Sequence, residues 1–401
     1  MPRQVIKRRS RGFICVNAHP EGCRLNVERQ IAIAAHATPG PLVPRNVLVI
    51  GASTGYGLAS RIAAAWGYGA RTLGVFFERP PSDDKTATAG YYNTVALHQH
   101  AQRDGLLAAS INGDAFSDAC KRETIALVRR EFAPLDLIIY SLASPKRTHP
   151  RTGVAYNSVL KPIGQPFSSR TIELDSEKVV DVTLAPATDK EIADTVAVMG
   201  GEDWRMWIDA FAAEGLLAAG ARTLAYTYIG PEMTWPIYRD GTIGRAKQDL
   251  EQTARTLDAQ LSAKLGGHAW VSVNKAVVTQ ASAAIPVVPL YMSLLSKVMR
   301  EKGLEEYPIE QACRLFADFM VGRPAPATDD AGRIRLDDRE MRADVQAAVA
   351  ELWPQVTTEN LRTLTNFGQF QRDFRNLFGF EVDGVDYDQP VETDLTYVQG
   401  I

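Results

Sequence analysis

Two residue types suited to proton transfer stand close together in the middle of the chain. Tyr238 and Lys247 lie nine positions apart, in the segment Tyr-Arg-Asp-Gly-Thr-Ile-Gly-Arg-Ala-Lys. Hydride chemistry on a polarised oxygen needs a proton donor, and a tyrosine serves when a nearby cation lowers its pKa and fixes its orientation. Tyr228, ten positions before Tyr238, competes for the same role. These three residues are therefore the candidate catalytic group.

The spacing predicts that Tyr238 and Lys247 lie in different structural elements. Residues three or four apart share a helix face, whereas nine residues correspond to about half a turn out of phase. A proline and a glycine on either side of Tyr238 favour a loop there, followed by a helix that begins near Ile243 with Asp240 or Thr242 as its cap. Lys247 then lies in the first or second turn of that helix and points over the edge of the sheet.

A strand, a glycine turn and a helix predict a cofactor site at the same edge. Val47–Ile50 is a run of four apolar residues, typical of a buried parallel strand. A turn with Gly51, Gly55 and Gly57 follows, and then an apolar helical segment, Leu58–Trp66. The glycines allow close approach of a ligand, and the free N–H groups and dipole of the helix N-terminus favour a phosphate. We therefore predict a dinucleotide-binding site, although the G-x-x-x-G-x-G spacing differs from the commoner G-x-G-x-x-G.

A second predicted strand, Arg71–Phe77, ends at Glu78. A carboxylate at this position can accept hydrogen bonds from the adenosine ribose hydroxyls and repels a 2′-phosphate, which favours NAD over NADP. Arg79 follows directly and suits a phosphate, so it weakens this preference. Tyr56, inside the glycine turn, faces the cofactor or the substrate, or only packs against its neighbours.

Strands and helices alternate along most of the chain, which predicts an α/β fold with a Rossmann-type, doubly wound parallel sheet. Ligands of such sheets lie beyond the carboxyl ends of the strands. At these ends Asp114 can accept from the adenine amino group, Ser141–Ala143 lets the cofactor pack closely, and backbone groups of Val277–Thr279 can pair with the nicotinamide carboxamide. The other predicted strands are 107–111, 135–140, 222–228 and 269–274 (continuing towards 280), and the other predicted helices are 86–104, 117–132, 206–219 and 243–265.

Three stretches fall outside this alternation within a single predicted domain, 1–401. They are an N-terminal extension at 1–45, a small β-rich insertion beside the active site at 145–200, and substrate-side lid helices with a C-terminal extension at 281–401. Within them we expect a short strand at 12–16, a helix at about 27–36 and, at 281–291, either an apolar substrate lid or ordinary helix packing.

Composition excludes several classes of protein. The chain of 401 residues is 45% hydrophobic and 23% charged with a net charge of −3, which is ordinary for a globular enzyme and gives no case for nucleic-acid binding. No run approaches the ~18 apolar residues of a membrane-spanning helix, and the basic N-terminus lacks the apolar segment of a signal peptide. Four cysteines and six histidines show no disulfide or metal-ligand spacing, which favours a cytoplasmic protein without a metal. The basic residues from Arg3 to Arg11 favour a solvated strand edge. The alternative is a positively charged surface that binds an acidic partner or a phosphorylated part of the substrate.

Several motifs together resemble the trans-2-enoyl-CoA reductase family. They are Val-Ile-Gly-Ala-Ser-Thr-Gly-Tyr-Gly at 49–57, the tyrosine and lysine at 238 and 247, Val-Val-Thr-Gln-Ala at 277–281, and Gly-Phe-Ile-Cys-Val-Asn-Ala-His-Pro at 12–20. Within the family the chain resembles the bacterial FabV-type enoyl-[acyl-carrier-protein] reductases. The separation of tyrosine and lysine is wider than ordinary short-chain dehydrogenases and other enoyl reductases have.

The resemblance implies a short-chain-dehydrogenase-like fold and an NADH-dependent, monomeric enzyme. Such an enzyme saturates the 2,3 double bond of enoyl thioesters, carried on acyl carrier protein or coenzyme A, in fatty-acid elongation. The resemblance also implies Tyr238 as proton donor and Tyr228 as substrate contact. The cofactor-binding residues that it implies are Gly51, Ala52, Ser53, Thr54, Gly55, Tyr56, Phe77, Glu78, Asp114, Ala115, Leu142, Ala143, Lys247, Val277, Val278 and Thr279.

Two other functions remain open at this point. A carbonyl reductase on a similar fold would protonate an alkoxide, but it would need a serine paired with a closer tyrosine and lysine, which this chain does not present. A non-catalytic NADH-binding protein would bind the cofactor without turnover.

Overall fold

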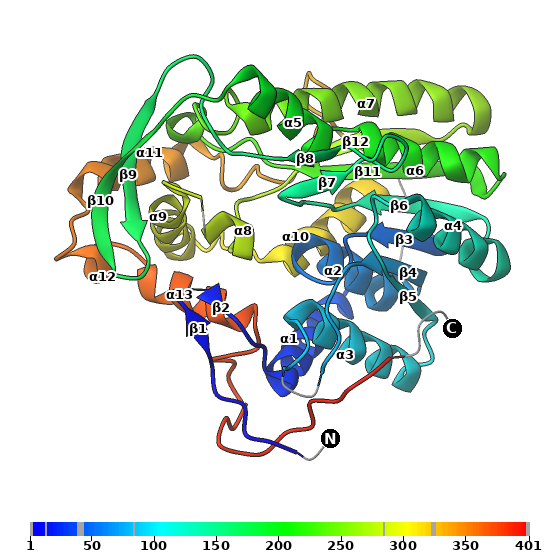
Figure 1. The fold of residues 1–401 in the computed structure, drawn as a ribbon, viewed down its shortest axis with the longest axis horizontal. Helices are drawn as coiled ribbons and strands as arrows, with labels where there is room; N and C mark the ends of the chain where they lie inside the picture. Colours follow the sequence, from blue (N-terminus) through cyan, green and yellow to red (C-terminus); the bar gives the residue numbers. More distant parts are fainter. Residues whose placement is uncertain are drawn as a thin grey trace.

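The computed structural model describes residues 3–12, 14–37, 44–82, 85–283, 285–321 and 326–397. At its centre lies a parallel sheet of seven strands in the order β13-β12-β11-β6-β3-β4-β5 (Figure 1). The chain enters at β3 and winds outwards in both directions, so the predicted doubly wound Rossmann-type sheet is confirmed. The strands are β3 (Asn46–Ile50), β4 (Arg71–Phe76), β5 (Ala108–Asn112), β6 (Leu135–Tyr140), β11 (Leu217–Thr227), β12 (His268–Val273) and β13 (Ile334–Arg335).

Helices cover both faces of this sheet because the strands are apolar on both sides. Val47, Val49 and Ile139 enter one core, whereas Leu48 and Ile138 enter the other. The first core is closed by α1 (Pro20–Ala34), α2 (Gly55–Ile62), α3 (Ala89–Arg103) and α10 (Pro308–Arg314). The second core is closed by α4 (Asp118–Leu127), α6 (Glu202–Ala213) and α7 (Thr242–Leu265), and α5 (Asp189–Met199) packs on α7.

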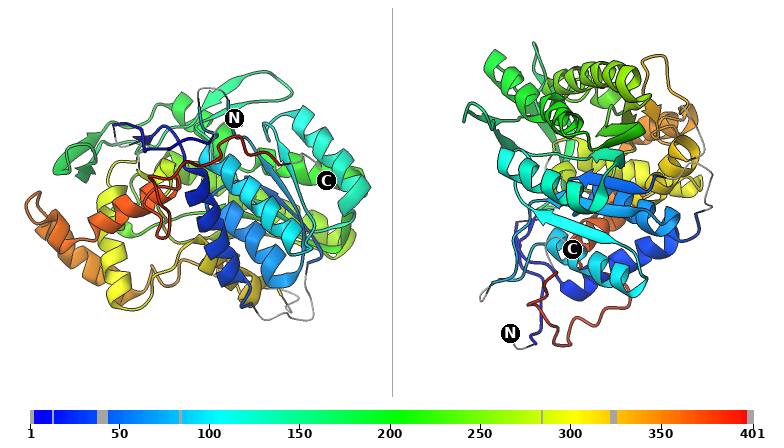
Figure 2. Two further views of the ribbon diagram at one scale, coloured as in Figure 1. Left: turned by 90° about the horizontal axis from the view of Figure 1, so that it is seen from below. Right: turned by 90° about the vertical axis from the view of Figure 1, so that its right-hand side faces the viewer.

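A third core lies to one side of the sheet and joins segments that are far apart in the sequence. Ile172 of the β9–β10 hairpin, Ile237, Leu290 and Phe367 all belong to it. Figures 1 and 2 show the hairpin beside the yellow and orange helices of the C-terminal part. The elements that form the third core are β9 (Phe167–Glu173), β10 (Lys178–Leu184), α9 (Val288–Glu301), α11 (Ala343–Leu352), α12 (Leu361–Leu364) and α13 (Phe367–Asn376).

Local sequence signals fix several helix ends. The Ser117 hydroxyl accepts a hydrogen bond from the Cys120 N–H at the start of α4. Thr188 and Glu191 form a capping box at the start of α5. The helix α7 ends, as predicted, at Gly266, whose φ of 64° suits the left-handed conformation that glycine adopts readily.

The N-terminal elements differ from the prediction. In place of one strand at 12–16 the chain forms a hairpin of β1 (Ser10–Arg11) and β2 (Ile14–Cys15), and position 13 lies outside the described residues. The first helix begins seven residues earlier than predicted, at Pro20, because the His19 ring accepts a hydrogen bond from the Gly22 N–H and caps it.

The elements around the insertion and the last strands also need correction. The predicted helix 206–219 is wrong at its end, because α6 stops at Ala213 and Leu217 already pairs with Leu135 in the sheet. The insertion contains β7 (Lys146–Thr148), β8 (Ala155–Asn157) and the β9–β10 hairpin, but it closes with the helix α5. The strand predicted from 269 ends at Val273, and the short strand β13 was not predicted. No helix among the described residues is long and apolar enough to span a bilayer.

Candidate active site

A large cavity lies beyond the carboxyl ends of the parallel strands. Its volume is about 1670 Å³, and residues that follow β3, β4, β5, β6, β11 and β12 line it. The N-terminal extension, the insertion and the helices α9, α10 and α13 complete the walls. All the predicted site residues lie on this cavity except Ala52, whose side chain is fully buried behind the glycine turn.

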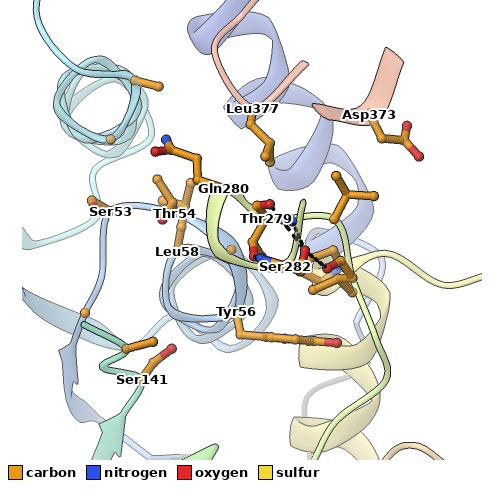
Figure 3. Close-up of a pocket in the computed structure, with 18 of the residues that line it drawn as sticks. Ser53, Thr54, Tyr56, Leu58, Ser141, Thr279, Gln280, Ser282, Asp373 and Leu377 are labelled. Atoms are coloured by element: carbon orange, nitrogen blue, oxygen red, sulfur yellow. Dashed lines mark hydrogen bonds between the residues drawn. The ribbon is translucent and has the colours of Figure 1, made fainter. Parts of the chain in front are cut away.

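The glycine turn brings backbone, rather than side chains, to the cavity. Gly51 has a φ of 88° and Gly55 a φ of 53°, which only glycine adopts without strain. A Cβ on Gly51 would lie 2.2 Å from the Ser141 carbonyl oxygen, and one on Gly57 would lie 1.9 Å from the Gly51 carbonyl oxygen. Thr54 precedes α2 without capping it, so the first N–H groups of the helix remain available (Figure 3). This cradle fits the diphosphate of a dinucleotide.

Glu78 lies beside the cradle, as the second-strand position predicts. Its carboxylate accepts a hydrogen bond of 2.7 Å from the Ser53 hydroxyl, and its backbone is fixed by two hydrogen bonds with the Asn112 side chain. The carboxylate also faces Gly90 at the start of α3, where a Cβ would lie 2.1 Å from it. A ribose hydroxyl can reach this carboxylate, whereas a 2′-phosphate would be repelled.

The predicted adenine side of the cavity is open. Asp114 is exposed, and one of its carboxylate oxygens accepts from the Phe116 N–H at 3.0 Å. Phe77 is 78% exposed, which is unusual for an aromatic side chain without a partner surface. Leu142 and Ala143 follow β6 along the cavity rim. A flat apolar ligand group would cover this surface.

The predicted carboxamide segment follows β12 along the opposite wall. The chain leaves the sheet after Val273 and runs through Val277, Val278 and Thr279 without strand pairing. The Thr279 N–H donates to the Ser282 hydroxyl at 2.8 Å, and the Ser282 N–H donates to the Thr279 hydroxyl at 2.9 Å (Figure 3). These reciprocal bonds hold the segment in a fixed shape against the cavity.

Tyr238 and Lys247 occupy the elements predicted for them. Tyr238 lies in a turn, where its N–H donates to the Thr234 carbonyl at 3.0 Å, and Lys247 lies in the second turn of α7. The predicted caps are wrong. Gly241 precedes the helix, Asp240 pairs with Arg239, and the Thr242 hydroxyl donates to the Val159 carbonyl of the insertion. The insertion therefore anchors the start of the helix that carries Lys247.

The ionisation of this pair differs from the prediction. Burial and the charge of Glu340 raise the pKa of Tyr238, which is opposite in direction to the lowering by a cation that we expected. Burial inside the cavity lowers the pKa of Lys247 to about 8. Among the described residues the Tyr238 hydroxyl has no hydrogen-bond partner, although the side chain is only 8% exposed. Tyr238 is therefore a neutral phenol whose hydroxyl is unpaired beside the cavity.

Tyr228 lies next to Tyr238 and is hydrogen-bonded to Glu340, a residue that the sequence did not predict. The two rings meet edge to face with centroids 5.0 Å apart. The Tyr228 hydroxyl donates to the Glu340 carboxylate at 2.9 Å, and Tyr291 of α9 donates to the same oxygen at 2.7 Å. Glu340 is fully buried, and its position in a run of charged residues, Asp337–Glu340, is typical of a solvated surface. No local sequence signal marked its burial.

Tyr56 bridges two walls of the cavity. Its hydroxyl donates to the Lys275 carbonyl at 2.7 Å, and its ring contacts that of Tyr226 at 5.6 Å between centroids. Tyr56 therefore packs against its neighbours and also lines the cavity (Figure 3), so it has more than the packing role alone.

Comparison with known proteins agrees with this geometry. The family model described as the trans-2-enoyl-CoA reductase catalytic region matches residues 85–321. The chain belongs to the trans-2-enoyl-CoA reductase family. A second model of the family, its NAD(P)H binding domain, matches residues 5–83, which hold the glycine cradle and Glu78. The predicted family and the predicted nicotinamide cofactor are thus confirmed.

Relatives of this family are similar along nearly their whole length. A Burkholderia pseudomallei protein named enoyl-[acyl-carrier-protein] reductase [NADH] is 56% identical over 98% of both chains. A Coxiella burnetii protein of the same name is 54% identical over 97% of this chain and 96% of its own. The Treponema denticola trans-2-enoyl-CoA reductase in complex with NAD superposes with a TM-score of 0.92 at 46% identity, over 99% of this chain and 100% of its own. The Clostridium acetobutulicum enzyme in complex with NADH superposes with a TM-score of 0.94 at 40% identity, over 98% of both chains.

A third family model, described as an enoyl reductase FAD binding domain, matches residues 328–391. All of this range is described, and it contains no parallel strand, glycine turn and helix of the kind at 46–62. The range therefore supplies no dinucleotide cradle of the kind formed by the glycine turn. The described residues also contain no group of three or more side chains that could hold a metal ion.

Proposed function

We propose that the protein uses NADH to reduce the trans-2,3 double bond of enoyl thioesters, the last step of the bacterial type II fatty-acid elongation cycle. The observation that carries this proposal is the unpaired Tyr238 hydroxyl, which lies on the same cavity as the glycine cradle and Glu78. The names of the full-length relatives support the same reaction and the same cofactor.

The residues of the chain would act on the thioester oxygen. Bound NADH supplies a hydride to C3 of the substrate, so that the electrons of the double bond move towards the thioester oxygen as an enolate. The Tyr238 hydroxyl would donate a hydrogen bond to that oxygen and transfer its proton to it, giving an enol that becomes the saturated thioester when C2 takes a proton from water and the oxygen loses its own. The resulting phenolate recovers a proton from water. Because burial keeps Tyr238 neutral, its proton is present when the negative charge develops.

Lys247 would stabilise negative charge on the cofactor side of the reaction. Its ammonium lies on the same cavity as Tyr238 and the cradle, and no described carboxylate pairs with it. A nearby anion or hydroxyl of a bound dinucleotide favours the charged form and restores a pKa that burial has lowered. We assign to Lys247 the binding of the cofactor and the stabilisation of the enolate by its charge.

The proposed cofactor contacts follow the cavity from end to end. The turn of Gly51, Ser53, Thr54 and Gly55 would hold the diphosphate, with Ala52 shaping the turn from behind and Tyr56 closing the wall. Glu78 would bind the adenosine ribose, which favours NADH over NADPH. Phe77, Asp114, Ala115, Leu142 and Ala143 would surround the adenine and the adjoining ribose, and Val277, Val278 and Thr279 would orient the nicotinamide.

A single assay separates the three functions considered. The chain is mixed with NADH and crotonyl-CoA, and the loss of NADH absorbance is followed. Turnover with the enoyl thioester supports the proposal. Turnover with ketones alone indicates a carbonyl reductase, and NADH binding without turnover of either indicates a non-catalytic protein.

We also propose that the enoyl thioester is carried on acyl carrier protein or coenzyme A and that the enzyme works as a cytoplasmic monomer. Comparing crotonyl-CoA with crotonyl-acyl carrier protein tests the carrier, and sedimentation and cell fractionation test the other two points. All four cysteines are free thiols, which is consistent with a reducing compartment.

The extensions at 1–45, 145–200 and 281–401 are proposed to be parts of one functional unit with the sheet. Asn17, Leu160 and Tyr291, one from each extension, line the same cavity. We therefore expect a single calorimetric unfolding transition that NADH moves as a whole to higher temperature.

A further inference from the structure

Glu340 links the tyrosine side of the cavity, at Tyr228, to the segment that leads into Val277–Thr279, at Ala276. Its segment lies between β13 and α11 and is held to the sheet because the N–H groups of Leu336 and Asp337 donate to the Val273 carbonyl at 2.9 and 3.1 Å. The Gln346 amide of α11 donates to the Glu340 carbonyl at 2.7 Å. The backbone that carries the carboxylate is therefore fixed from both neighbouring elements.

Three donors converge on the two oxygens of this carboxylate. One oxygen accepts from the hydroxyls of Tyr228 and Tyr291, at 2.9 and 2.7 Å, and the other accepts from the Ala276 N–H at 2.7 Å. Burial raises the pKa of Glu340, and the charge of Lys275 and the three hydrogen bonds oppose that rise. An ionised carboxylate satisfies all three donors without a proton of its own.

This arrangement gives the two cavity tyrosines different roles. A tyrosine hydroxyl has one proton, and that of Tyr228 is directed to Glu340, away from the cavity. The Tyr238 hydroxyl makes no such bond within the described structure, so its proton is free for the substrate. At its other oxygen Glu340 fixes Ala276, which adjoins the Val277–Thr279 segment.

We propose that Glu340 is a positioning residue of the reduction: it directs the Tyr228 proton away from the substrate, so that Tyr238 alone donates, and it anchors the backbone that leads into the nicotinamide segment. This inference rests on the proposed function. It predicts that the carboxylate affects kcat through Tyr228 and affects NADH affinity through Ala276, two effects that separate substitutions can distinguish.

The test compares Glu340→Gln with Glu340→Ala. The glutamine amide oxygen still accepts from the Ala276 N–H, but its NH₂ group donates to the tyrosines and reverses the Tyr228 hydrogen bond. The freed Tyr228 hydroxyl then competes with Tyr238 for the thioester oxygen and displaces the proton donor, so we expect kcat with crotonyl-CoA to fall about tenfold in Glu340→Gln, while the NADH dissociation constant stays within about twofold. In Glu340→Ala both acceptors are lost, so NADH affinity also falls about tenfold.

A double-mutant cycle with Tyr228→Phe shows whether Glu340 acts through Tyr228. If it does, adding Glu340→Gln to Tyr228→Phe changes kcat by less than about twofold. Asp337→Asn is the matched control, because this buried acid of the same segment pairs with Arg335 and does not contact the tyrosines. It is expected to lower the melting temperature and to leave kcat and NADH affinity of the folded enzyme unchanged.

Wild-type kcat in Glu340→Gln, an undiminished effect in the Tyr228→Phe background, or the same kinetic changes in Asp337→Asn would overturn the inference. If Glu340→Gln does not fold, Tyr291→Phe replaces it, with a severalfold fall in kcat expected and wild-type kcat as the contrary result. If the wild-type chain does not reduce crotonyl-CoA, the proposed function fails, and the NADH affinities of the two Glu340 variants still test the anchoring of Ala276.

Discussion

Replacing Tyr238 by phenylalanine removes one hydroxyl and little else. The ring keeps its edge-to-face contact with Tyr228, whose centroid lies 5.0 Å away. Because the hydroxyl has no partner among the described residues, its loss orphans no other polar group. We therefore expect the free energy of unfolding to change by less than about 0.5 kcal/mol.

The same substitution should strongly impair the reaction. Removing one preorganised donor to a developing oxyanion costs about 2.7–4 kcal/mol, or roughly 10²–10³-fold in kcat. The same substitution also removes the transferable proton. We therefore expect the loss of kcat to reach or exceed the upper end of this range. The NADH dissociation constant should stay within about twofold of the wild-type value, because the cradle is untouched.

The assay is steady-state reduction of crotonyl-CoA, followed by NADH absorbance, together with NADH titration by fluorescence and a melting curve. Tyr156→Phe in the β7–β8 hairpin is the control, because Tyr156 does not line the cavity. More than about a tenth of wild-type kcat in Tyr238→Phe would refute the assignment and move the proton donor to Tyr228.

Three further predictions concern the cofactor. NADH binding at pH 8 should take up protons, because burial lowers the pKa of Lys247 to about 8 and the anionic cofactor favours the charged form of this lysine. Calorimetry in buffers of different ionisation enthalpy should detect this uptake in the wild-type chain. It should detect none in Lys247→Met, and none in the wild type at about pH 6, where Lys247 is already charged. Glu78→Ala should raise the NADPH-to-NADH ratio of kcat/KM by at least about tenfold, and an unchanged ratio would remove Glu78 from the ribose site. Gly57→Ala places a methyl group 1.9 Å from the Gly51 carbonyl oxygen, so it should weaken NADH binding by more than about tenfold, and an unaltered dissociation constant would show that the turn tolerates opening.

The central sheet and the cofactor side of the cavity could be predicted from the sequence because their signals are local. In the first strand of the sheet, Val47–Ile50 is a continuous apolar run, and the turn after it needs glycine for reasons of backbone geometry. The spacing of Tyr238 and Lys247 forces a break between loop and helix, and α7 does begin between them.

The features that were missed depend on contacts between distant segments. The strand β13 has two residues and pairs only with Ser272 and Val273, so no periodicity marks it. Glu340 lies in a charged run that resembles solvated surface, and its burial arises only when β12, α9 and α11 meet around it. The raised pKa of Tyr238 likewise depends first on the burial of its ring and then on the Glu340 charge, both of which arise only in the folded chain.

The third core has a consequence for the order in which the chain becomes competent. The Arg170 guanidinium of the insertion donates to the Val356 carbonyl at 2.6 Å, and the Val287 N–H donates to the Thr171 hydroxyl at 3.1 Å, across more than a hundred residues of chain. Such contacts close late, because a long loop must be ordered before they form. During synthesis the glycine cradle can form once the first few strands of the sheet have been made. The part of the cavity around Tyr238 cannot be completed until the last quarter of the polypeptide has been made. A nascent or truncated chain would therefore acquire affinity for dinucleotides well before it can turn over a thioester.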